Sequence, residues 1–378
     1  MKDTVRITVM GDICPSWGYS DLFKTGDPSV IFGDILDCIG DTDYLVANLE
    51  SPVTLNDNKL SKNSVCLKAN PAELSVIKKA GIDAMAIANN HILDYGVSGL
   101  EDTVRYLQEN NIEFYGAGDI EEAVKPLIKE IKGMKIAFLA FAEREFNCPI
   151  DYQKGANLWD DLSSIDLIRH VRKQCDFLIV QYHGGIEHYR YPSPCLRKKC
   201  RAMAEAGANF ITCQHSHCIG THENWHGAEI LYGQGNSIFG YEKGDNLWNN
   251  GLIAQIDITD GFRTKYIPIT ATVKGERLLN QSEADELIAD FEKESDKIFS
   301  DEFIKTQWDQ FCDTQRDAYL PMLFCYGRIN NKINRVTRGF LIEIFTRYKN
   351  RRNTMNLIRC DAHREVIQTI LEKDIYHE

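Results

Sequence analysis

The sequence has no pair of cysteines at CxxC spacing, although it contains 12 cysteines in 378 residues. Zinc ribbons and related cysteine-rich metal sites need such pairs, so this class of site is excluded. Several cysteines, such as Cys175 and Cys213, lie within apolar runs. We therefore expect reduced, buried thiols, because disulfide frameworks are typical of much shorter secreted chains.

Long apolar runs are also missing. The N-terminal segment MKDTVRITVMGD has an apolar run too short for a secretory signal, and acidic residues flank that run on both sides. No later stretch approaches the ~20 apolar residues that a membrane-spanning helix needs. We therefore expect no transmembrane segment and a cytoplasmic protein that can associate with a membrane through partners, unless an N-terminal anchor has been removed.

Basic residues are fewer than acidic ones: the sequence has 43 lysines and arginines and 55 aspartates and glutamates, which gives a formal net charge of -12. Such a chain repels phosphate backbones, so nucleic acid is not an expected partner. Hydrophobic residues make up 43% of the sequence, which is enough for a sizeable core in one large domain or two smaller ones.

Short apolar runs alternate with amphipathic stretches along the first 215 residues or so, in an order that predicts an α/β layered domain. From residue 229 to residue 273 the pattern is strand-only, which predicts a second sheet or a sheet edge closed by antiparallel strands. The expected strands are Val5–Met10, Tyr44–Ala47, Ala84–Ala88, Ile136–Phe141, Phe177–Tyr182 and Phe210–Thr212, and the expected helices between them are Ser98–Asn110, Ser164–Gln174 and Leu196–Ala206.

Beyond about residue 280 the strand pattern fades and helical periodicity dominates, in 284–298, 339–352 and 362–373. We therefore predict a main domain of residues 1–275 and a helical C-terminal extension of residues 276–378. Basic residues gather between Arg328 and Arg352, opposed only by Glu343. This basic segment is interpreted as a helix packed on the acidic domain, or as a surface for an acidic polymer, a membrane or a partner protein.

Side chains of metal-ligand type follow successive predicted strands. In open α/β sheets, ligands bind at the carboxyl ends of the strands. Two metals about 3.5–4 Å apart need a shared carboxylate, and a neutral histidine beside them can protonate a leaving oxygen. One such residue is usually a cap or a surface side chain, but the repeated placement predicts a divalent-metal site built from Asp12, Glu50, Asn90, His91, His183, His215 and His217.

Seven short motifs also make the chain similar to a known family. The chain resembles the CapA family, the poly-γ-glutamate capsule biosynthesis proteins, which share the calcineurin-like metallophosphoesterase fold. The motifs occur in family order over roughly residues 5 to 260, and they are VMGDI at Val9–Ile13, NLESPVT at Asn48–Thr54, ANNHILDYG at Ala88–Gly96, YGAG at Tyr115–Gly118, QYHGGIEH at Gln181–His188, GANFITCQHSH at Gly207–His217 and YGQGNSIF at Tyr232–Phe239.

The resemblance implies a four-layer α/β/β/α sandwich with two divalent cations, whose identity as manganese, iron or zinc stays open. It implies that Glu50 bridges the two cations and that Asp12 and His217 ligate the first. It further implies that the second cation is held by Asn90, His183 and His215. His91 is implied to lie beside the bound oxyanion as proton donor or electrostatic stabiliser.

The chain departs from the metallophosphoesterase pattern at the first strand. Asp-x-His is usual there, whereas this chain has Asp12-Ile13-Cys14. The first cation is therefore expected to be weakly held if Cys14 only packs, which is our preferred interpretation, or to be ligated by a Cys14 thiolate, which favours zinc. The usual His-Trp-Gly is also altered, to His183-Gly184-Gly185.

Five further residues are candidates for contacts around the site. Glu187, His188 and Arg144 are candidate substrate-binding residues, with solvated loop positions as the alternative. Asp94 is interpreted as fixing the loop that presents His91 or as an ordinary turn residue. Asn236 is expected to hold a glycine-rich turn.

The residues and the resemblance together favour a metal-dependent hydrolase with a phosphoesterase-type dinuclear site. It would act in the biosynthesis of a capsule or exopolymer, either poly-γ-glutamate or an acidic polysaccharide. The expected partners are an anionic polymer or phosphoester substrate and the capsule-synthesis machinery, while the oligomeric state is open. Two alternatives remain: a non-catalytic assembly factor that binds a polymer or a synthase on the same fold, and a mononuclear site with only the second cation.

Overall fold

The computed structural model describes residues 3–62, 64–147 and 154–323, together with isolated positions from 332 to 358. It divides into two compact units, Met1–Ile304 and Lys305–Glu378. The first unit contains every candidate site residue. Most of the basic segment from Arg328 to Arg352, and the predicted helices at 339–352 and 362–373, lie outside the described residues.

The first sheet has eight strands, with β1, β2, β3 and β4 running parallel to one another. The strands β14, β15 and β16 close one edge in antiparallel order, and β13 adds to β1 in parallel. The strands are β16 (Gly275–Leu278), β15 (Phe262–Thr272), β14 (Asn250–Ile258), β1 (Val5–Ile13), β2 (Tyr44–Leu49), β3 (Ala84–Ala86), β4 (Glu113–Tyr115) and β13 (Asn236–Ile238).

The second sheet has six strands in the order β11-β12-β10-β9-β7-β6. Its four inner strands are parallel, and an antiparallel strand covers each edge. Its strands are β11 (His222–Trp225), β12 (Ala228–Leu231), β10 (Phe210–Gln214), β9 (Phe177–His183), β7 (Met134–Ala142) and β6 (Leu127–Ile131), and a separate small sheet pairs β5 (Ala117–Asp119) with β8 (Lys154–Ala156).

Three buried clusters show how the layers stack. Strand side chains alternate between faces with a period of two, so that on β7 Phe138 faces the other sheet and Leu139 faces the outer helices. The cluster between the sheets joins residues such as Val9, Phe138 and Ile179. The outer clusters contain helix residues such as Leu74 on the first sheet and Met203 on the second. The expected α/β/β/α sandwich is therefore confirmed.

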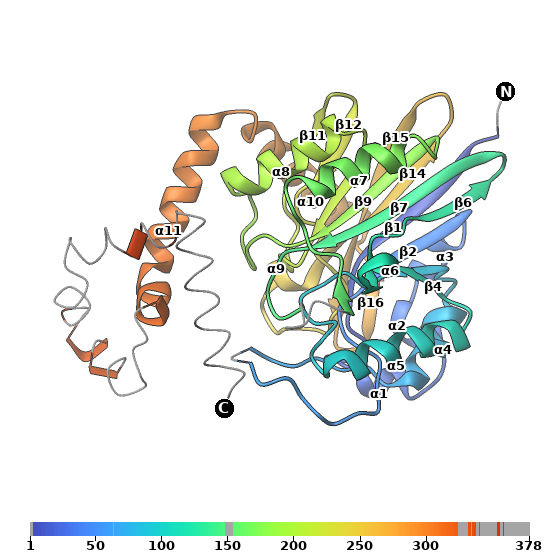
Figure 1. Ribbon diagram of the computed structural model, residues 1–378, viewed down its shortest axis with the longest axis horizontal. Helices are drawn as coiled ribbons and strands as arrows, with labels where there is room; N and C mark the ends of the chain where they lie inside the picture. The colour runs from blue at the N-terminus through green and yellow to red at the C-terminus, as the bar shows by residue number, and fades with distance from the viewer. Residues whose placement is uncertain are drawn as a thin grey trace. The chain divides into compact units, whose positions relative to one another are not determined.

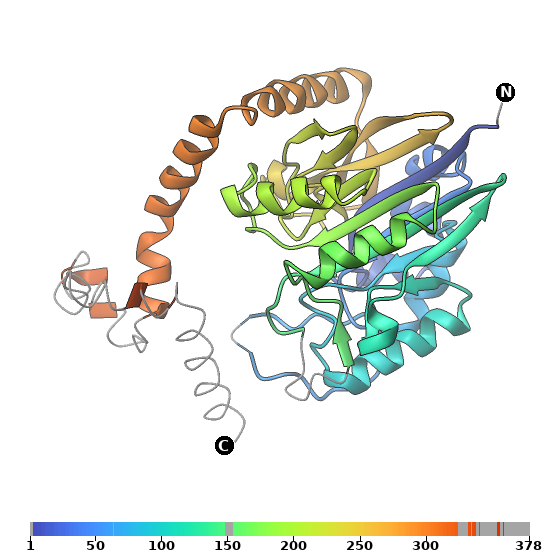
Figure 2. The same cartoon turned by 45° about the horizontal axis from the view of Figure 1, so that its top comes forward.

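The helices of the first unit cover opposite outer faces of the two sheets, as Figure 1 and Figure 2 show for α4 and α5 against α7 and α8. The strand and helix positions predicted from periodicity up to residue 298 are confirmed, with ends that differ by a few residues. The helices are α1 (Ser20–Phe23), α2 (Pro28–Phe32), α3 (Ile35–Ile39), α4 (Pro71–Lys79), α5 (Gly96–Glu109), α6 (Ile120–Ala123), α7 (Ser163–Arg172), α8 (Pro194–Glu205) and α9 (Asn246–Asn249).

The strand-only stretch after residue 229 does not stay in one sheet. Its first strand, β12, joins the second sheet, whereas β14 and β15 close the edge of the first. Helices follow, as expected: α10 (Gln281–Lys297) begins with a capping box between Asn280 and Glu283, and α11 spans Asp301–Leu323. The predicted start of the C-terminal extension at residue 276 stays a prediction, since the first compact unit runs to Ile304.

Within the described part of the chain, none of the helices combines the length and the apolar character that crossing a bilayer requires.

Candidate metal centre

The ends of five strands, three from the first sheet and two from the second, bring the predicted ligands together. Asp12 lies near the end of β1, where the pairing with β2 shifts register, and Glu50 follows β2 directly. Asn90 lies in the turn after β3. His183 is the last residue of β9, and His215 follows β10, so each sheet supplies part of the site.

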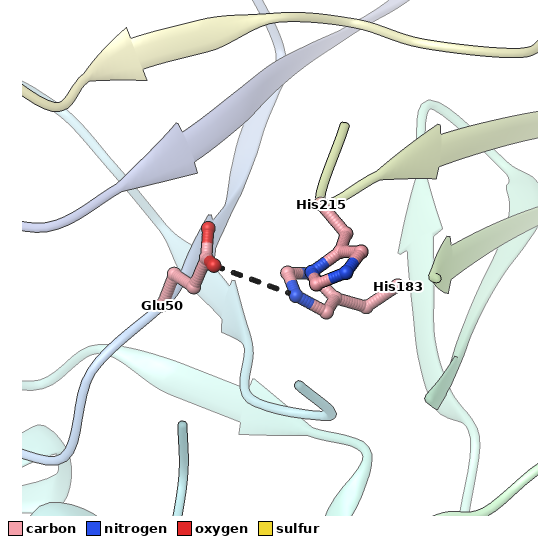
Figure 3. A group of neighbouring side chains, drawn as sticks. All are labelled: Glu50, His183 and His215. Atoms are coloured by element: carbon pink, nitrogen blue, oxygen red, sulfur yellow. Dashed lines mark ion pairs between the residues drawn. The ribbon is translucent and has the colours of Figure 1, made fainter. Parts of the chain in front are cut away.

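Two groups of buried donors form at this edge and share Glu50. Asp12, Glu50 and His217 offer ligand atoms that lie within 4.8 Å of one another, and so do Glu50, His183 and His215. Figure 3 shows the second group, with the Glu50 carboxylate directed toward the His183 imidazole. We call these the first and second donor sets. They bring together residues for which the family resemblance implies a shared cation, and their roles as ligands stay predictions.

Asn90 adds an oxygen to the second donor set. Its Oδ1 lies 3.0 Å from Nε2 of His183, and the same nitrogen lies 3.5 Å from Oε1 of Glu50. An imidazole nitrogen therefore faces an amide oxygen and a carboxylate oxygen at distances found between ligands of one cation. Nitrogen and oxygen donors together suit manganese, iron or zinc.

The Glu50 carboxylate is the strongest sign that the site holds cations. Glu50 has no solvent exposure, and neither of its oxygens has a hydrogen-bond partner in the described part of the chain. Burial, followed by the neighbouring Asp12, raises its pKa well above the ordinary value. A buried carboxylate without a partner costs free energy, which a bound cation would offset. The donor residues therefore fit a pair of divalent cations.

The three histidines of the donor sets are suited to binding a cation at neutral pH. Burial, with His215 next, holds the pKa of His183 well below its ordinary value. Burial also lowers the pKa of His215, and it lowers the pKa of His217 to about 4. These rings are therefore neutral near pH 7 and keep a lone pair for a metal.

Backbone strain gathers at the same place. His215 and His217 have φ angles of 92° and 52°, in the left-handed region that residues other than glycine rarely adopt. His188, on the neighbouring loop, has φ of 57°. Such strain costs about 1–3 kcal/mol per residue and concentrates at functional sites. The chain therefore holds these rings in place at the expense of local stability.

Two asparagines hold the first donor set from outside. Asn48 donates from Nδ2 to Oδ1 of Asp12 at 2.8 Å, and this Nδ2 also lies 3.3 Å from Nδ1 of His183. Asn236 presents Oδ1 to Nδ1 of His217 at 2.8 Å, which leaves Nε2 of His217 facing Glu50 at 3.7 Å. The role of Asn236 in the glycine-rich turn stays a prediction, and its contact with His217 fixes the orientation of that ring.

His91 lies beside the donor sets. Its Nε2 is 4.0 Å from Oε1 of Glu50, and its Nδ1 is 2.7 Å from Oδ2 of Asp94. Asp94 is fully buried and also accepts a hydrogen bond from the backbone nitrogen of Leu67 at 2.6 Å. Asp94 therefore holds both the His91 ring and the loop next to it, as one of the two sequence interpretations proposed.

Lys62 is a neighbour of His91 that the sequence did not predict. Its side chain is fully buried, its ammonium group pairs with Asp94, and its Nζ lies 3.3 Å from Nδ1 of His91. The ammonium also lies over the Phe146 ring, 5.2 Å from the ring centre. Lys62 comes from a polar loop without periodicity, so no sequence signal separated it from ordinary surface lysines.

Cys14 packs in a small apolar cluster, as our preferred interpretation expects. The side chain is buried against Leu67 and Phe239. Burial, followed by the charge of Glu50, raises the pKa of its thiol, so the thiolate that a metal needs is disfavoured. Among the described residues, Cys14 belongs to neither donor set.

The three candidate substrate contacts lie on exposed loops around the centre. His188 stacks on Trp248 with ring centres 6.0 Å apart, and its ring centre is 6.4 Å from that of His217. The charge of Glu187 acts on both Glu50 and His215. Arg144 is exposed on the turn after β7. Their roles toward a substrate stay predictions.

Glu50→Gln is expected to stabilise the cation-free protein. Unfolded Glu50 ionises near pH 4.5, whereas the folded residue keeps its proton to higher pH. Stability therefore declines as pH rises above about 4.5 in the wild type. Glutamine has no proton to lose, so the stability of the variant does not fall in this way. The stability difference between the variant and the wild type is therefore absent below pH 4.5 and grows toward pH 8. Thermal unfolding in the presence of chelator measures this difference, because the melting temperature shifts by roughly 2 °C per kcal/mol in a domain of this size. Equal melting temperatures at every pH would contradict it.

Comparison with known proteins gives one family and several curated relatives. Residues 6–241 match the family described as bacterial capsule synthesis protein PGA_cap. The PGA biosynthesis protein CapA of Bacillus subtilis (strain 168) is 29% identical over 247 residues, which are 63% of this chain and 64% of that protein. The capsule biosynthesis protein CapA of Bacillus anthracis is 27% identical over 269 residues, with 68% and 65% coverage. The chain thus spans less than two thirds of the length of these relatives.

Among solved structures, a 5'-nucleotidase precursor from Thermus thermophilus is similar over 76% of this chain and 58% of that chain, with 13% identity and a TM-score of 0.45. A hypothetical protein from the same organism is similar over 70% of this chain and 99% of that chain, with 11% identity and a TM-score of 0.43.

Proposed function

The chain belongs to the bacterial capsule synthesis protein PGA_cap family, and on that premise we propose that it is a metal-dependent hydrolase of capsule or exopolymer biosynthesis. One divalent cation would be held by Asp12, Glu50 and His217. The other would be held by Glu50, Asn90, His183 and His215. The substrate would be a phosphoester or an anionic polymer, either poly-γ-glutamate or an acidic polysaccharide. Components of the capsule-synthesis machinery are the proposed protein partners.

One observation supports the proposal above the others, namely that Glu50 belongs to both donor sets and has two buried oxygens without hydrogen-bond partners in the described chain. A structural carboxylate at such a depth is normally paired or hydrogen-bonded. A pair of bound cations supplies Lewis-acid polarisation of a phosphoryl or carbonyl oxygen. Glu50 is placed to hold such a pair together.

The chain's own contribution to the chemistry comes from His91 and Asp94. Asp94 holds Nδ1 of His91 at 2.7 Å, which fixes the ring plane and directs Nε2 toward the donor sets. When both ring nitrogens carry a proton, the Nδ1 proton stays with Asp94 and Nε2 can give its proton to a leaving oxygen, which leaves a neutral imidazole. The buried ammonium of Lys62 balances the charge of Asp94, so the carboxylate stays available to the imidazole.

The exposed loops around the centre provide groups for binding a substrate. The His188–Trp248 stack lies beside His217, and an aromatic face of this kind suits a sugar ring or another flat group. Arg144 offers a guanidinium that binds carboxylates and phosphates in a bidentate manner. Glu187 adds a hydrogen-bond acceptor next to the second donor set. We propose these three residues as substrate contacts.

The test is reconstitution with manganese or zinc, followed by parallel assays on p-nitrophenyl phosphate, bis(p-nitrophenyl) phosphate and poly-γ-glutamate. The proposal expects cation-dependent cleavage of at least one substrate and its loss in His215→Ala. His170→Ala, which removes an exposed histidine of α7, serves as the control and should keep wild-type activity. Cleavage that is indifferent to chelator and to His215→Ala would contradict the proposal.

A non-catalytic assembly factor is the second candidate function. The observation that favours it is Cys14, a packed thiol at the position where the usual pattern has a ligand, which leaves the first donor set with three described residues. A protein that binds cations but cleaves neither phosphoesters nor the polymer, while it binds poly-γ-glutamate, would favour this role.

A further inference from the structure

Glu145 touches two members of the second donor set, although its sequence position gave no sign of this. It lies in the turn that follows β7. Its Oε2 accepts a hydrogen bond from Nδ2 of Asn90 at 3.1 Å, and its Oε1 lies 4.0 Å from Nε2 of His215. The Glu145 side chain is 40% exposed, whereas Glu50 is fully buried.

The contact with Asn90 determines which end of that amide faces the donor set. An ionised carboxylate only accepts hydrogen bonds, so it selects the NH₂ end of an asparagine. With Nδ2 held by Glu145, Oδ1 of Asn90 points to Nε2 of His183 at 3.0 Å. A cation needs the oxygen, because the amide nitrogen has no lone pair to offer. Glu145 therefore fixes Asn90 in the orientation that can bind a metal.

The position relative to His215 has a similar effect on the imidazole. Nδ1 of His215 is buried and lacks a hydrogen-bond partner within the described chain. The other nitrogen, Nε2, faces the Glu145 carboxylate. A carboxylate next to one ring nitrogen favours the proton on that nitrogen, and the lone pair then remains on the other. His215 is thus prepared to bind through Nδ1.

The turn that carries Glu145 is itself held firmly. Asn147 is fully buried, its Oδ1 accepts from the backbone nitrogen of Glu145 at 3.0 Å, and its Nδ2 donates to the carbonyl of Glu143 at 2.9 Å. The Glu143 carboxylate accepts from the backbone nitrogen of Gly185 at 3.1 Å. Since Gly185 belongs to the loop after His183, the turn and the ligand loop are joined.

The two donor sets therefore have different outer contacts. The first is oriented by Asn236 and by Asn48, which are neutral and buried, and Asn48 also contacts His183 of the second. The second set has the exposed carboxylate of Glu145 as an outer contact of Asn90 and His215. The second set also contains a single carboxylate, the shared Glu50, so an added negative charge compensates a bound dication.

We infer that Glu145 is a positioning residue for the second cation, acting on Asn90 and His215 together. The inference rests on the proposed metal centre and adds to it a residue whose loss affects one cation and leaves the other. Outer partners of metal ligands are typically worth about 10–100-fold in affinity. Glu145→Ala is thus expected to weaken the second cation by that factor while the first stays as in the wild type.

The test is calorimetric titration of the cation-free protein with Co²⁺, accompanied by the visible spectrum of bound Co²⁺. Glu145→Ala should show one unchanged and one weakened binding event, with a changed second-site spectrum. Glu145→Gln, which can still accept from Asn90 but lacks the charge, should fall between Glu145→Ala and the wild type. Glu130→Ala, which removes an exposed carboxylate of β6, is the matched control.

The outcomes separate this inference from the proposed function. Two cations bound to Glu145→Ala with wild-type affinity and spectrum would overturn the role of Glu145 and leave the metal centre intact. A wild type that binds no Co²⁺ would overturn the metal centre and this inference with it. Thermal unfolding of the cation-free variants checks the fold, since a merely structural role would lower their melting temperatures.

Discussion

Glu50→Gln is expected to release both cations, whereas His217→Ala and His215→Ala should each release one. The reason is that Glu50 is the member common to the two donor sets, while each histidine belongs to one of them. Elemental mass spectrometry of protein reconstituted with manganese should give about two metals per chain in the wild type. It should give about one in either histidine variant and none in Glu50→Gln.

The expected loss of cation affinity is large, and control variants separate it from other effects. Removing an outer partner of a metal ligand typically lowers cation affinity by about 10–100-fold. Removing the bridging ligand should lower the affinity at least as much, and for both cations. His170→Ala controls for histidine loss outside the site. Glu50→Gln that keeps one cation at full affinity would show that Glu50 serves a single site. About one metal in the wild type would favour the mononuclear alternative.

His91→Ala is expected to reduce turnover by roughly 10²–10⁴-fold, the usual contribution of a general acid or base, and to keep both cations. His91 lies 4.0 Å from Glu50 but belongs to neither donor set among the described residues, so cation binding does not depend on it. Steady-state kinetics and metal content on the same preparation measure the two effects. Loss of cations in His91→Ala would instead make it a ligand.

Asp94→Asn gives the matched comparison for His91→Ala. Asparagine keeps the size of Asp94 and removes the charge that holds Nδ1 of His91 at 2.7 Å. We expect a smaller loss of turnover than in His91→Ala, and no additional loss when the two changes are combined, because both act through one imidazole. Independent, multiplying losses would show that Asp94 acts elsewhere, for instance through the buried Lys62.

Much of the fold and the donor residues could be predicted from the sequence, because both depend on local patterns. A β-branched run such as Val5–Met10 is a strand almost anywhere, and a polar residue just after such a run lies at a sheet edge. Asp12, Glu50 and His183 were found in this way. Which residues share a cation was implied by the family resemblance and stays a prediction, although the structure groups Glu50 with His183 and His215 and with Asp12 and His217.

The outer contacts could not be predicted, because they depend on how distant loops meet. Lys62 and Glu145 come from loops without periodicity, and nothing in their neighbouring residues distinguishes them from solvated side chains. Asn48 lies inside a strand, where an asparagine is unusual, but its partners Asp12 and His183 come from two different sheets. Only the packing of one sheet on the other brings such partners together.

A crystal of the manganese-loaded protein would show directly whether two cations share Glu50. Anomalous difference density is expected to show two peaks about 3.5–4 Å apart, one beside Asp12 and His217 and the other beside His183 and His215, with Glu50 between them. A single peak, or two peaks away from Glu50, at full manganese loading would contradict the account.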